Sequence, residues 1–422
     1  MLSSQSGLFS RFVSYDAVES TKVQSKTAQG FAQRTTGKAG IKENNTTLKT
    51  TIETLHAALS PLYDRQETKA IIRLLLEEVC GLSYTDILMH RDDWVLPPEQ
   101  AALLRGYAVR LAAGEPVQQV MGYATFRGRR FEVDRSVLIP RPETEQLVQL
   151  VVDDFAKRPV ENSVDISRNN PVDSPLDNAV DNPVEKAMDN FQSEAPAGGG
   201  AQECHPLDNP VDNPVCKAID KSVDISVDNP VQTPAFRLLD IGTGSGCIAV
   251  SLALEINNVL ITALDFSTSA LEVARKNAKA LSAKNICFVQ ADILKEENED
   301  FSTELSTYHA IVSNPPYICR REAAQMSVNV LDYEPPTALF VPDSDPLLFY
   351  RAIAKCALRR LESCGKLYFE INEAYGPDVC HLLEGLGYQQ VTLHRDFFGK
   401  DRFVTGVKVD CAKKVLNKTD KQ

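Results

Sequence analysis

The chain has 422 residues, of which 43% are hydrophobic and 24% are charged, with 21 glycines and 23 prolines. This composition is typical of globular proteins and excludes a collagen, a coiled coil and a wholly disordered chain; no apolar run approaches the roughly 18 to 20 residues that cross a bilayer. The formal net charge is -12, but residues 158–235, with 14 acidic and 5 basic side chains, contribute -9 of it and leave -3 for the rest. A broad phosphate-binding surface is therefore not expected, and we predict a cytoplasmic monomer that contacts neither nucleic acid nor membrane directly.

Three segments have compositions that disfavour a packed core. Residues 1–47 are rich in Ser, Thr and Gln with scattered basic side chains, and they predict a disordered leader, with a transit peptide as the alternative. Residues 158–235 hold ten prolines, one aromatic residue and four copies of Asp-Asn-Pro-Val. Because so few apolar side chains cannot offset the entropy of ordering the chain, we predict a disordered acidic repeat insertion there. Residues 410–422 are expected to form a tail.

The segment before the insertion divides into two parts. In residues 48–121 apolar side chains recur at helical spacing, with breaks at Gly81 and at Pro97-Pro98, which predicts a domain of four or five helices. No catalytic cluster accompanies these helices, so a substrate-recognition role is expected. In residues 122–157 two short β-like runs predict a hairpin, and Pro142 suits the first turn of a linking helix.

From residue 236 to residue 409 strand-like and helix-like segments alternate, which predicts an α/β domain built on a parallel sheet. The last two strands follow one another closely and are expected to form an antiparallel edge. The expected strands are 236–241, 260–265, 286–290, 310–313, 366–371, 390–394 and 403–409.

A glycine-rich turn, Gly-Thr-Gly-Ser-Gly from Gly242 to Gly246, joins the first of these strands to a helix. Its glycines allow a tight turn whose backbone approaches a ligand closely at the helix N-terminus. The dinucleotide fingerprint would need glycine at Cys247, and a phosphate-binding P-loop would need a Gly-Lys-Ser/Thr ending that is absent. Nucleotide hydrolysis is thereby disfavoured.

Polar residues follow the next strands at the same edge of the predicted sheet. Asp265 ends a strand 19 residues after Gly246, where a carboxylate can accept both hydroxyls of a ribose; its structural alternative is a helix cap. Asp292 and Ile293 follow the third strand, where the acid or its neighbour can meet an adenine edge, with a turn-forming aspartate as the alternative.

The tetrapeptide Asn314-Pro315-Pro316-Tyr317 closes the fourth strand and is the most informative motif. Two prolines remove two backbone donors and restrict φ, so the Asn314 side chain and the neighbouring carbonyls are held rigidly at the sheet edge. A rigid polar corner of this kind suits a planar amide or amine that presents its nitrogen.

Together these motifs resemble S-adenosylmethionine-dependent methyltransferases that modify nitrogen in planar groups. The segment Ile139-Pro-Arg-Pro-Glu-Thr-Glu145, the hairpin and the helical domain narrow the resemblance to the protein-glutamine methyltransferases that act on peptide chain release factors. The similarity runs from about Thr50 to Val409 and excludes the repeat insertion. It implies a doubly wound, seven-stranded, Rossmann-like class I methyltransferase sheet, S-adenosyl-L-methionine as cofactor, and release factors as protein substrates. No metal is expected, because the ten cysteines are scattered without a Cys-x-x-Cys pair or a histidine cluster beside them.

The resemblance also implies roles for individual residues. The implied cofactor-binding residues are Gly242, Thr243, Gly244, Ser245, Gly246, Asp265, Ile293 and Asn314. The implied substrate-binding residues are Asn314, Pro315, Pro316 and Tyr317, with Asn314, Pro315 and Tyr317 as catalytic residues.

The chemistry of a glutamine amide explains why such a corner is needed. The lone pair of the amide nitrogen is conjugated, as the peptide rotation barrier of about 18 to 20 kcal/mol indicates, so the nitrogen is a poor nucleophile that must be oriented. We expect the Asn314 side-chain oxygen and the Pro315 carbonyl to accept the two amide hydrogens, leaving the nitrogen facing the sulfonium methyl, while Tyr317 packs on the glutamine side chain. Alignment of this kind can supply about 7 to 11 kcal/mol.

Two other functions fit parts of the pattern. The same Asn-Pro-Pro-Tyr corner serves enzymes that methylate exocyclic amines of DNA or RNA, but such substrates favour a basic face, and they leave the segment from Ile139 to Glu145 without a role. A scaffold that binds the cofactor without turnover is the non-enzymatic alternative. The intact Asn314, Asp265 and glycine turn disfavour it.

Overall fold

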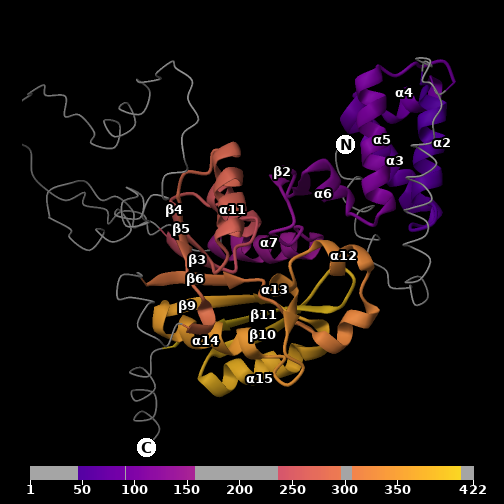
Figure 1. Ribbon diagram of the computed structural model, residues 1–422. Helices are drawn as coiled ribbons and strands as arrows, with labels where there is room; N and C mark the ends of the chain where they lie inside the picture. The colour runs from indigo at the N-terminus through magenta and orange to yellow at the C-terminus, as the bar shows by residue number, and fades with distance from the viewer. Residues whose placement is uncertain (1–45, 91, 157–235, 296–306, 410–422) are drawn as a thin grey trace, which may run out of the picture.

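The computed structural model describes residues 46–90, 92–156, 236–295 and 307–409 (Figure 1). Residues 1–45 of the predicted leader, the predicted insertion 158–235 and the predicted tail 410–422 lie outside the described residues. Figure 1 shows the helical domain to one side of the larger α/β domain, with a short helix and the β-hairpin between them. The domain boundaries inferred from composition remain a prediction.

Among the described residues, five helices form the amino-terminal domain, where four or five are expected. They are α2 (Leu48–Leu59), α3 (Arg65–Cys80), α4 (Tyr84–Met89), α5 (Pro98–Ala112) and α6 (Val117–Met121). Asp64 begins α3 by accepting hydrogen bonds from the backbone amides of Gln66 and Glu67, and Gly81 ends it in the left-handed conformation at φ 67°. The apolar face of each longer helix is buried in one core, which includes Leu55, Leu75 and Leu104.

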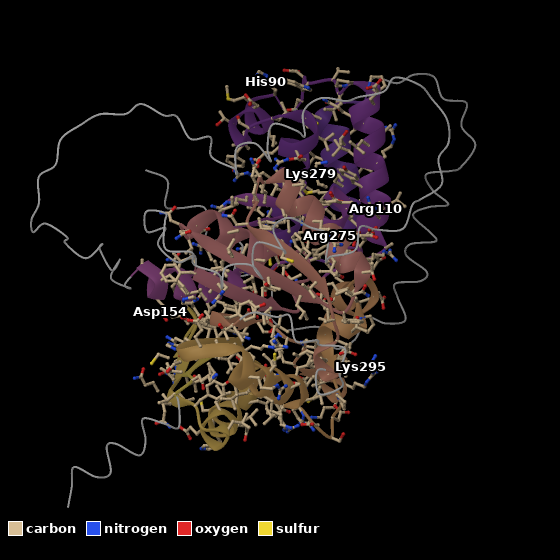
Figure 2. The ribbon with its side chains drawn as sticks, turned by 90° about the vertical axis from the view of Figure 1, so that its left-hand side faces the viewer. His90, Arg110, Asp154, Arg275, Lys279 and Lys295 are labelled. Carbon is tan, nitrogen blue, oxygen red and sulfur yellow. The ribbon has the colours of Figure 1, made fainter. Side chains whose placement is uncertain are left out.

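The hairpin and the linking helix form where the sequence predicts them. Strands β1 (Tyr123–Phe126) and β2 (Arg129–Glu132) pair antiparallel across a turn in which Arg127 and Gly128 have φ 48° and 72°. Helix α7 (Pro142–Ala156) then runs along the sheet. Near its end Asp154, which is labelled in Figure 2, pairs with Lys366 Nζ at 2.5 Å and holds that end of the helix on a central strand.

The sheet has seven strands in the order β10-β11-β9-β6-β3-β4-β5. Strands β9, β6, β3, β4 and β5 are parallel, and β11 and β10 are antiparallel, so the predicted antiparallel edge is confirmed. The strands are β3 (Phe236–Ile241), β4 (Val259–Asp265), β5 (Ile286–Gln290), β6 (Tyr308–Ser313), β9 (Leu361–Glu370), β10 (Gln389–Arg395) and β11 (Asp401–Val407). This arrangement confirms the predicted α/β, seven-stranded methyltransferase fold.

Helices cover both faces of the sheet. Neighbouring residues of a strand point to opposite faces, and apolar side chains on both faces are buried beneath helices. Leu238 and its neighbours pack in one core with α7 and α10 (Cys247–Glu255), next to α11 (Thr268–Ala280). Leu239 faces a second core with α14 (Leu348–Arg360) and α15 (Gly376–Leu386). Burial on both faces explains the nearly continuous apolar character of the central strands.

The segment between β6 and α14 contains elements that the sequence pattern did not predict. They are β7 (Ile318–Cys319), β8 (Phe340–Val341), η4 (Arg320–Gln325), α12 (Val328–Tyr333) and α13 (Pro336–Leu339). Each is too short to show a hydrophobic period. Strand β9 also begins at Leu361, five residues before the expected start. Helix α12 meets the helical domain, where Asn329 Nδ2 donates to the Tyr63 hydroxyl at 2.9 Å.

Candidate active site

The predicted site residues gather at the carboxyl ends of four parallel strands. The glycine turn follows β3, Asp265 ends β4, Ile293 follows β5 and Asn314 follows β6. The chain continues from β3 toward β4 and β5 on one side of the sheet, and later returns to β6 on the other side. Ligands of open α/β sheets bind at such a point, where the strand order reverses.

The glycine turn adopts a backbone conformation that residues other than glycine rarely adopt. Gly242, Gly244 and Gly246 have φ of 75°, 55° and 79°. A Cβ at Gly246 would lie 3.0 Å from Ala274 Cβ on α11, whereas a Cβ at Gly242 or Gly244 would meet no atom within 4 Å. The turn is therefore packed against the protein at Gly246 and open at the two earlier glycines, which leaves space for a ligand against the backbone.

Asp265 is buried and braces the glycine turn. Its Oδ2 accepts a hydrogen bond from Gly244 N at 2.9 Å, and its Oδ1 accepts one from Ser267 N at 3.0 Å. Burial raises the pKa of this carboxyl. Each carboxylate oxygen has two lone pairs, so the capping role and the predicted contact with ribose hydroxyls are compatible.

Asp240, the penultimate residue of β3, is a second buried acid, and the sequence motifs predicted no role for it. Its Oδ2 accepts hydrogen bonds from Thr243 Oγ1 at 2.7 Å and from Ala249 N at 3.2 Å, whereas its buried Oδ1 has no partner among the described residues. An acidic side chain that follows the apolar pair Leu238-Leu239, just before a glycine turn, was the signal that could have identified it.

Neutralising Asp240 is expected to stabilise the fold above pH 7. Burial raises the pKa of Asp240 from 3.8 to about 7. The folded chain thus holds this proton more tightly than the unfolded chain, and the resulting stabilisation is complete below about pH 4 and lost as the pH rises through about 7. The Asp240→Asn protein should have a higher thermal midpoint than the wild type at pH 8, with a difference that shrinks toward pH 5. Calorimetry measures both midpoints, and a difference independent of pH would contradict the assignment.

The residues after β5 form a tight turn. Asp292 Oδ1 accepts a hydrogen bond from Leu294 N at 3.0 Å and begins η3 (Ile293–Lys295), so the turn-forming interpretation of Asp292 is confirmed. Ile293 is 9% exposed and packs in the core beneath. Ala291 N donates to Asp265 O at 3.0 Å, which brings this turn to the end of β4.

Asn314 is held by a residue of the linking helix. Its Nδ2 donates to Thr144 Oγ1 at 3.1 Å, while its Oδ1 accepts no hydrogen bond from any residue that the structure describes. The carbonyl of the buried Pro315 likewise receives none within the described ranges. Two acceptors therefore stand unpaired at the sheet edge where the sequence predicts a glutamine amide.

Thr144 and Glu370 lie beside Asn314, and the sequence motifs predicted a role for neither residue. Thr144 Oγ1 donates to Glu370 Oε2 at 2.7 Å, and Tyr317 OH donates to Glu370 Oε1 at 3.3 Å. Glu370 ends β9 one residue beyond the pair Ser313 and Phe369 of the β6–β9 register, so it lies beside Asn314. An acidic residue directly after the short run Leu367-Tyr-Phe369 was the available signal.

The segment Ile139 to Arg141 positions the start of α7. Glu334, 3% exposed, accepts a hydrogen bond from Ile139 N at 3.1 Å and pairs with Arg141 Nη2 at 2.5 Å. These contacts hold the first turn of α7, and thus Thr144, against the sheet edge. The motif therefore contributes a residue to the site as well as a helix start.

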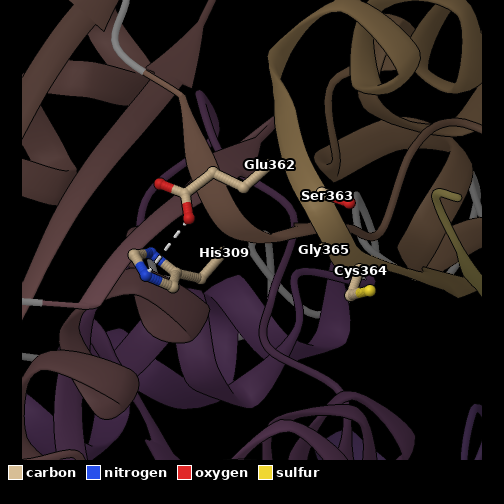
Figure 3. A pocket seen from close by; sticks show the side chains of 5 residues that line it. All are labelled: His309, Glu362, Ser363, Cys364 and Gly365. Carbon is tan, nitrogen blue, oxygen red and sulfur yellow. Dashed lines mark ion pairs between the residues drawn. The ribbon is translucent and has the colours of Figure 1, made fainter. Parts of the chain in front are cut away.

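A separate cavity lies away from these residues. It has a volume of about 290 Å³ and is lined by His309, Glu362, Ser363, Cys364 and Gly365 (Figure 3). His309 Nε2 lies 3.4 Å from Glu362 Oε2. Both residues are at the amino ends of β6 and β9, opposite the edge that carries Asn314, so this cavity is not part of the candidate site.

The described part of the chain contains no helix that is long and apolar enough to span a membrane. Within the same ranges no three His, Cys, Asp or Glu side chains come together as they would around a metal ion. The backbone of the glycine turn, which is open at Gly242 and Gly244, fits an organic cofactor with polar groups.

Comparisons with known proteins agree with this geometry. Residues 53–122 match the family profile described as PrmC N-terminal domain, and residues 232–341 match the one described as methyltransferase domain. A release factor glutamine methyltransferase from Bacteroides thetaiotaomicron is 35% identical over 83% of this chain and 96% of its own. One from Flavobacterium psychrophilum is 33% identical over 82% and 94%.

Among solved structures, TrmN from Thermus thermophilus is 21% identical over 42% of this chain and 45% of that chain, with a TM-score of 0.29 that is too low to carry a conclusion. These two relatives are sufficient to assign the family of this chain, because the match covers nearly their full length. They confirm the resemblance that the motifs predict. This chain belongs to the release factor glutamine methyltransferase family.

Proposed function

We propose that this protein transfers a methyl group from S-adenosyl-L-methionine to the side-chain amide nitrogen of the glutamine in the Gly-Gly-Gln motif of peptide chain release factors. The observation that carries the proposal is the corner at Asn314. Its carboxamide is anchored through nitrogen on Thr144, and among the residues that the structure describes its oxygen and the Pro315 carbonyl have no donor. Two acceptors match the two hydrogens of a primary amide.

The proposed cofactor site lies at the same edge of the sheet. When bound, S-adenosyl-L-methionine supplies an electrophilic methyl group. The backbone of Gly242 to Gly246 would approach it closely, the Asp265 carboxylate would accept the ribose hydroxyls, and Ile293 would contact the adenine. Thr243 and Ser245 are both buried in the turn, and Thr243 holds Asp240 at its base.

The target amide needs orientation more than activation. With both hydrogens held by Asn314 Oδ1 and the Pro315 carbonyl, the plane of the amide would be fixed, and the nitrogen lone pair perpendicular to this plane would be presented to the methyl donor. Pro315 and Pro316 limit backbone motion around the acceptors, and the Tyr317 ring would pack on the glutamine side chain. A general base is not needed until the methylated nitrogen loses its proton, and we assign none.

The exocyclic amine of a nucleic acid is not favoured as substrate, because the curated relatives that match most of the chain are named for release factor glutamine. A protein substrate that acts in translation supports the proposed cytoplasmic location. The monomeric state and the absence of direct contact with nucleic acid stay predictions.

Incubation with methyl-labelled S-adenosyl-L-methionine tests the function. We expect label on a release factor and none on the same factor with the Gly-Gly-Gln glutamine replaced by alanine. Label on RNA or DNA would support the alternative substrate class. Cofactor binding without label on any of these would indicate a scaffold without turnover.

A further inference from the structure

Glu370 is the least exposed charged group at the Asn314 corner, with 1% of its surface exposed. Its two carboxylate oxygens receive the hydroxyls of Thr144 and Tyr317, at 2.7 and 3.3 Å. The three residues come from α7, the Asn-Pro-Pro-Tyr motif and β9, which are distant in the sequence. A buried carboxylate at the meeting point of three segments can set the orientation of each side chain that it binds.

Counting hydrogens shows what this contact does to Asn314. A threonine hydroxyl carries one hydrogen, and Thr144 directs it to the Glu370 carboxylate. The Thr144 oxygen can then only accept, so it must face a donor, which is the Asn314 Nδ2 group at 3.1 Å. A rotated carboxamide would turn Asn314 Oδ1 toward this oxygen and bring two acceptors together. The contact therefore selects one of the two amide orientations.

We infer that Glu370 is a positioning residue that acts through Thr144 to hold the Asn314 carboxamide with its oxygen toward the substrate amide. This inference rests on the proposed function and adds the residues that make the Asn314 corner selective for a hydrogen-donating amide. Neither Glu370 nor Thr144 touches the reacting atoms. Pre-orientation by a fixed neighbour removes a conformational search from the catalytic step.

An ionised Glu370 can only accept, and this imposes the selection. A protonated Glu370 could instead donate to Thr144, whose own hydrogen could then turn to Asn314 Oδ1, so that one amide orientation would no longer be imposed. Burial raises the pKa of Glu370 to about 7, with Arg402 opposing the shift. The titratable or charged groups that face Glu370 are Arg402, Glu143, Tyr317, Tyr350 and Cys247. Turnover is therefore expected to fall as the pH decreases through about 7.

Two substitutions of Thr144 form a matched test. Thr144→Val keeps the shape of the side chain but removes the hydroxyl, whereas Thr144→Ser keeps the hydroxyl and loses the methyl group. We expect Thr144→Val to lower kcat on a release factor by about 10- to 100-fold, and Thr144→Ser to stay within about threefold of the wild type. Calorimetric binding of S-adenosyl-L-methionine should change by less than about threefold in both proteins.

The Glu370→Gln protein provides a second measurement that does not depend on the folding of the valine variant. It removes the ionisation without changing the size of the side chain. Its kcat should be lower than that of the wild type above pH 7 and should lack the decrease that the wild type shows below that pH.

Three outcomes would overturn the inference: an unimpaired Thr144→Val protein, equal losses in the valine and serine variants, or an unchanged pH profile in Glu370→Gln. They differ from failure of the proposed function, in which the wild type itself would not label the release-factor glutamine.

Discussion

The Asn314→Ala protein is expected to bind S-adenosyl-L-methionine almost normally and to lose about 100- to 1,000-fold in kcat, the usual effect of removing one preorganised hydrogen-bonding group from an active site. Alanine removes the acceptor for one amide hydrogen, and it leaves the glycine turn and Asp265 in place. The defect should therefore appear in turnover and not in the cofactor dissociation constant. Calorimetry and a methyl-transfer assay measure the two quantities on the same protein.

The exposed Thr392 of β10 provides the control for this experiment. Strand β10 is the outer edge of the sheet, with β11 and β9 between it and β6. Thr392→Ala should leave both turnover and binding unchanged. Full activity of Asn314→Ala would remove the basis of the assigned reaction, and a parallel loss of cofactor binding would show that Asn314 serves the cofactor more than the substrate.

Replacing Asp265 by asparagine is expected to weaken S-adenosyl-L-methionine binding by about 10- to 100-fold. Bonds to a charged group contribute about 1.5 to 3 kcal/mol and neutral ones about 0.5 to 1.5 kcal/mol, and each 1.4 kcal/mol corresponds to a factor of ten. The asparagine also turns one of the acceptors for Gly244 N and Ser267 N into a donor, which loosens the glycine turn.

A matched substitution separates this effect from a general change in charge. Asp378 is an exposed acid in the first turn of α15, away from the carboxyl ends of β3 and β4. The Asp378→Asn protein should bind the cofactor with an unchanged dissociation constant. If Asp265→Asn also bound normally, Asp265 would be only the cap of the turn, and the ribose contact would be wrong.

Much of the fold follows from short stretches of sequence. Alternating strand and helix patterns from residue 236 onward predict the sheet, because side-chain periodicity reflects local backbone geometry. The glycine turn, Asp265 and the Asn-Pro-Pro-Tyr motif are placed correctly at one sheet edge, because parallel strands all end there. The positions of these residues needed no tertiary information, whereas their roles in binding and catalysis remain proposals.

The contacts that orient Asn314 depend on tertiary structure alone. Asn314 and Thr144 are 170 residues apart, Thr144 and Glu370 are 226 apart, and the predicted insertion lies between them in the chain. No local pattern indicates which threonine will meet which glutamate, because a hydrogen bond between side chains is decided by strand order and by the packing of α7 on β9. Residue types and spacing thus identify the chemistry, while the packed fold determines which atoms of Asn314 remain free to perform it.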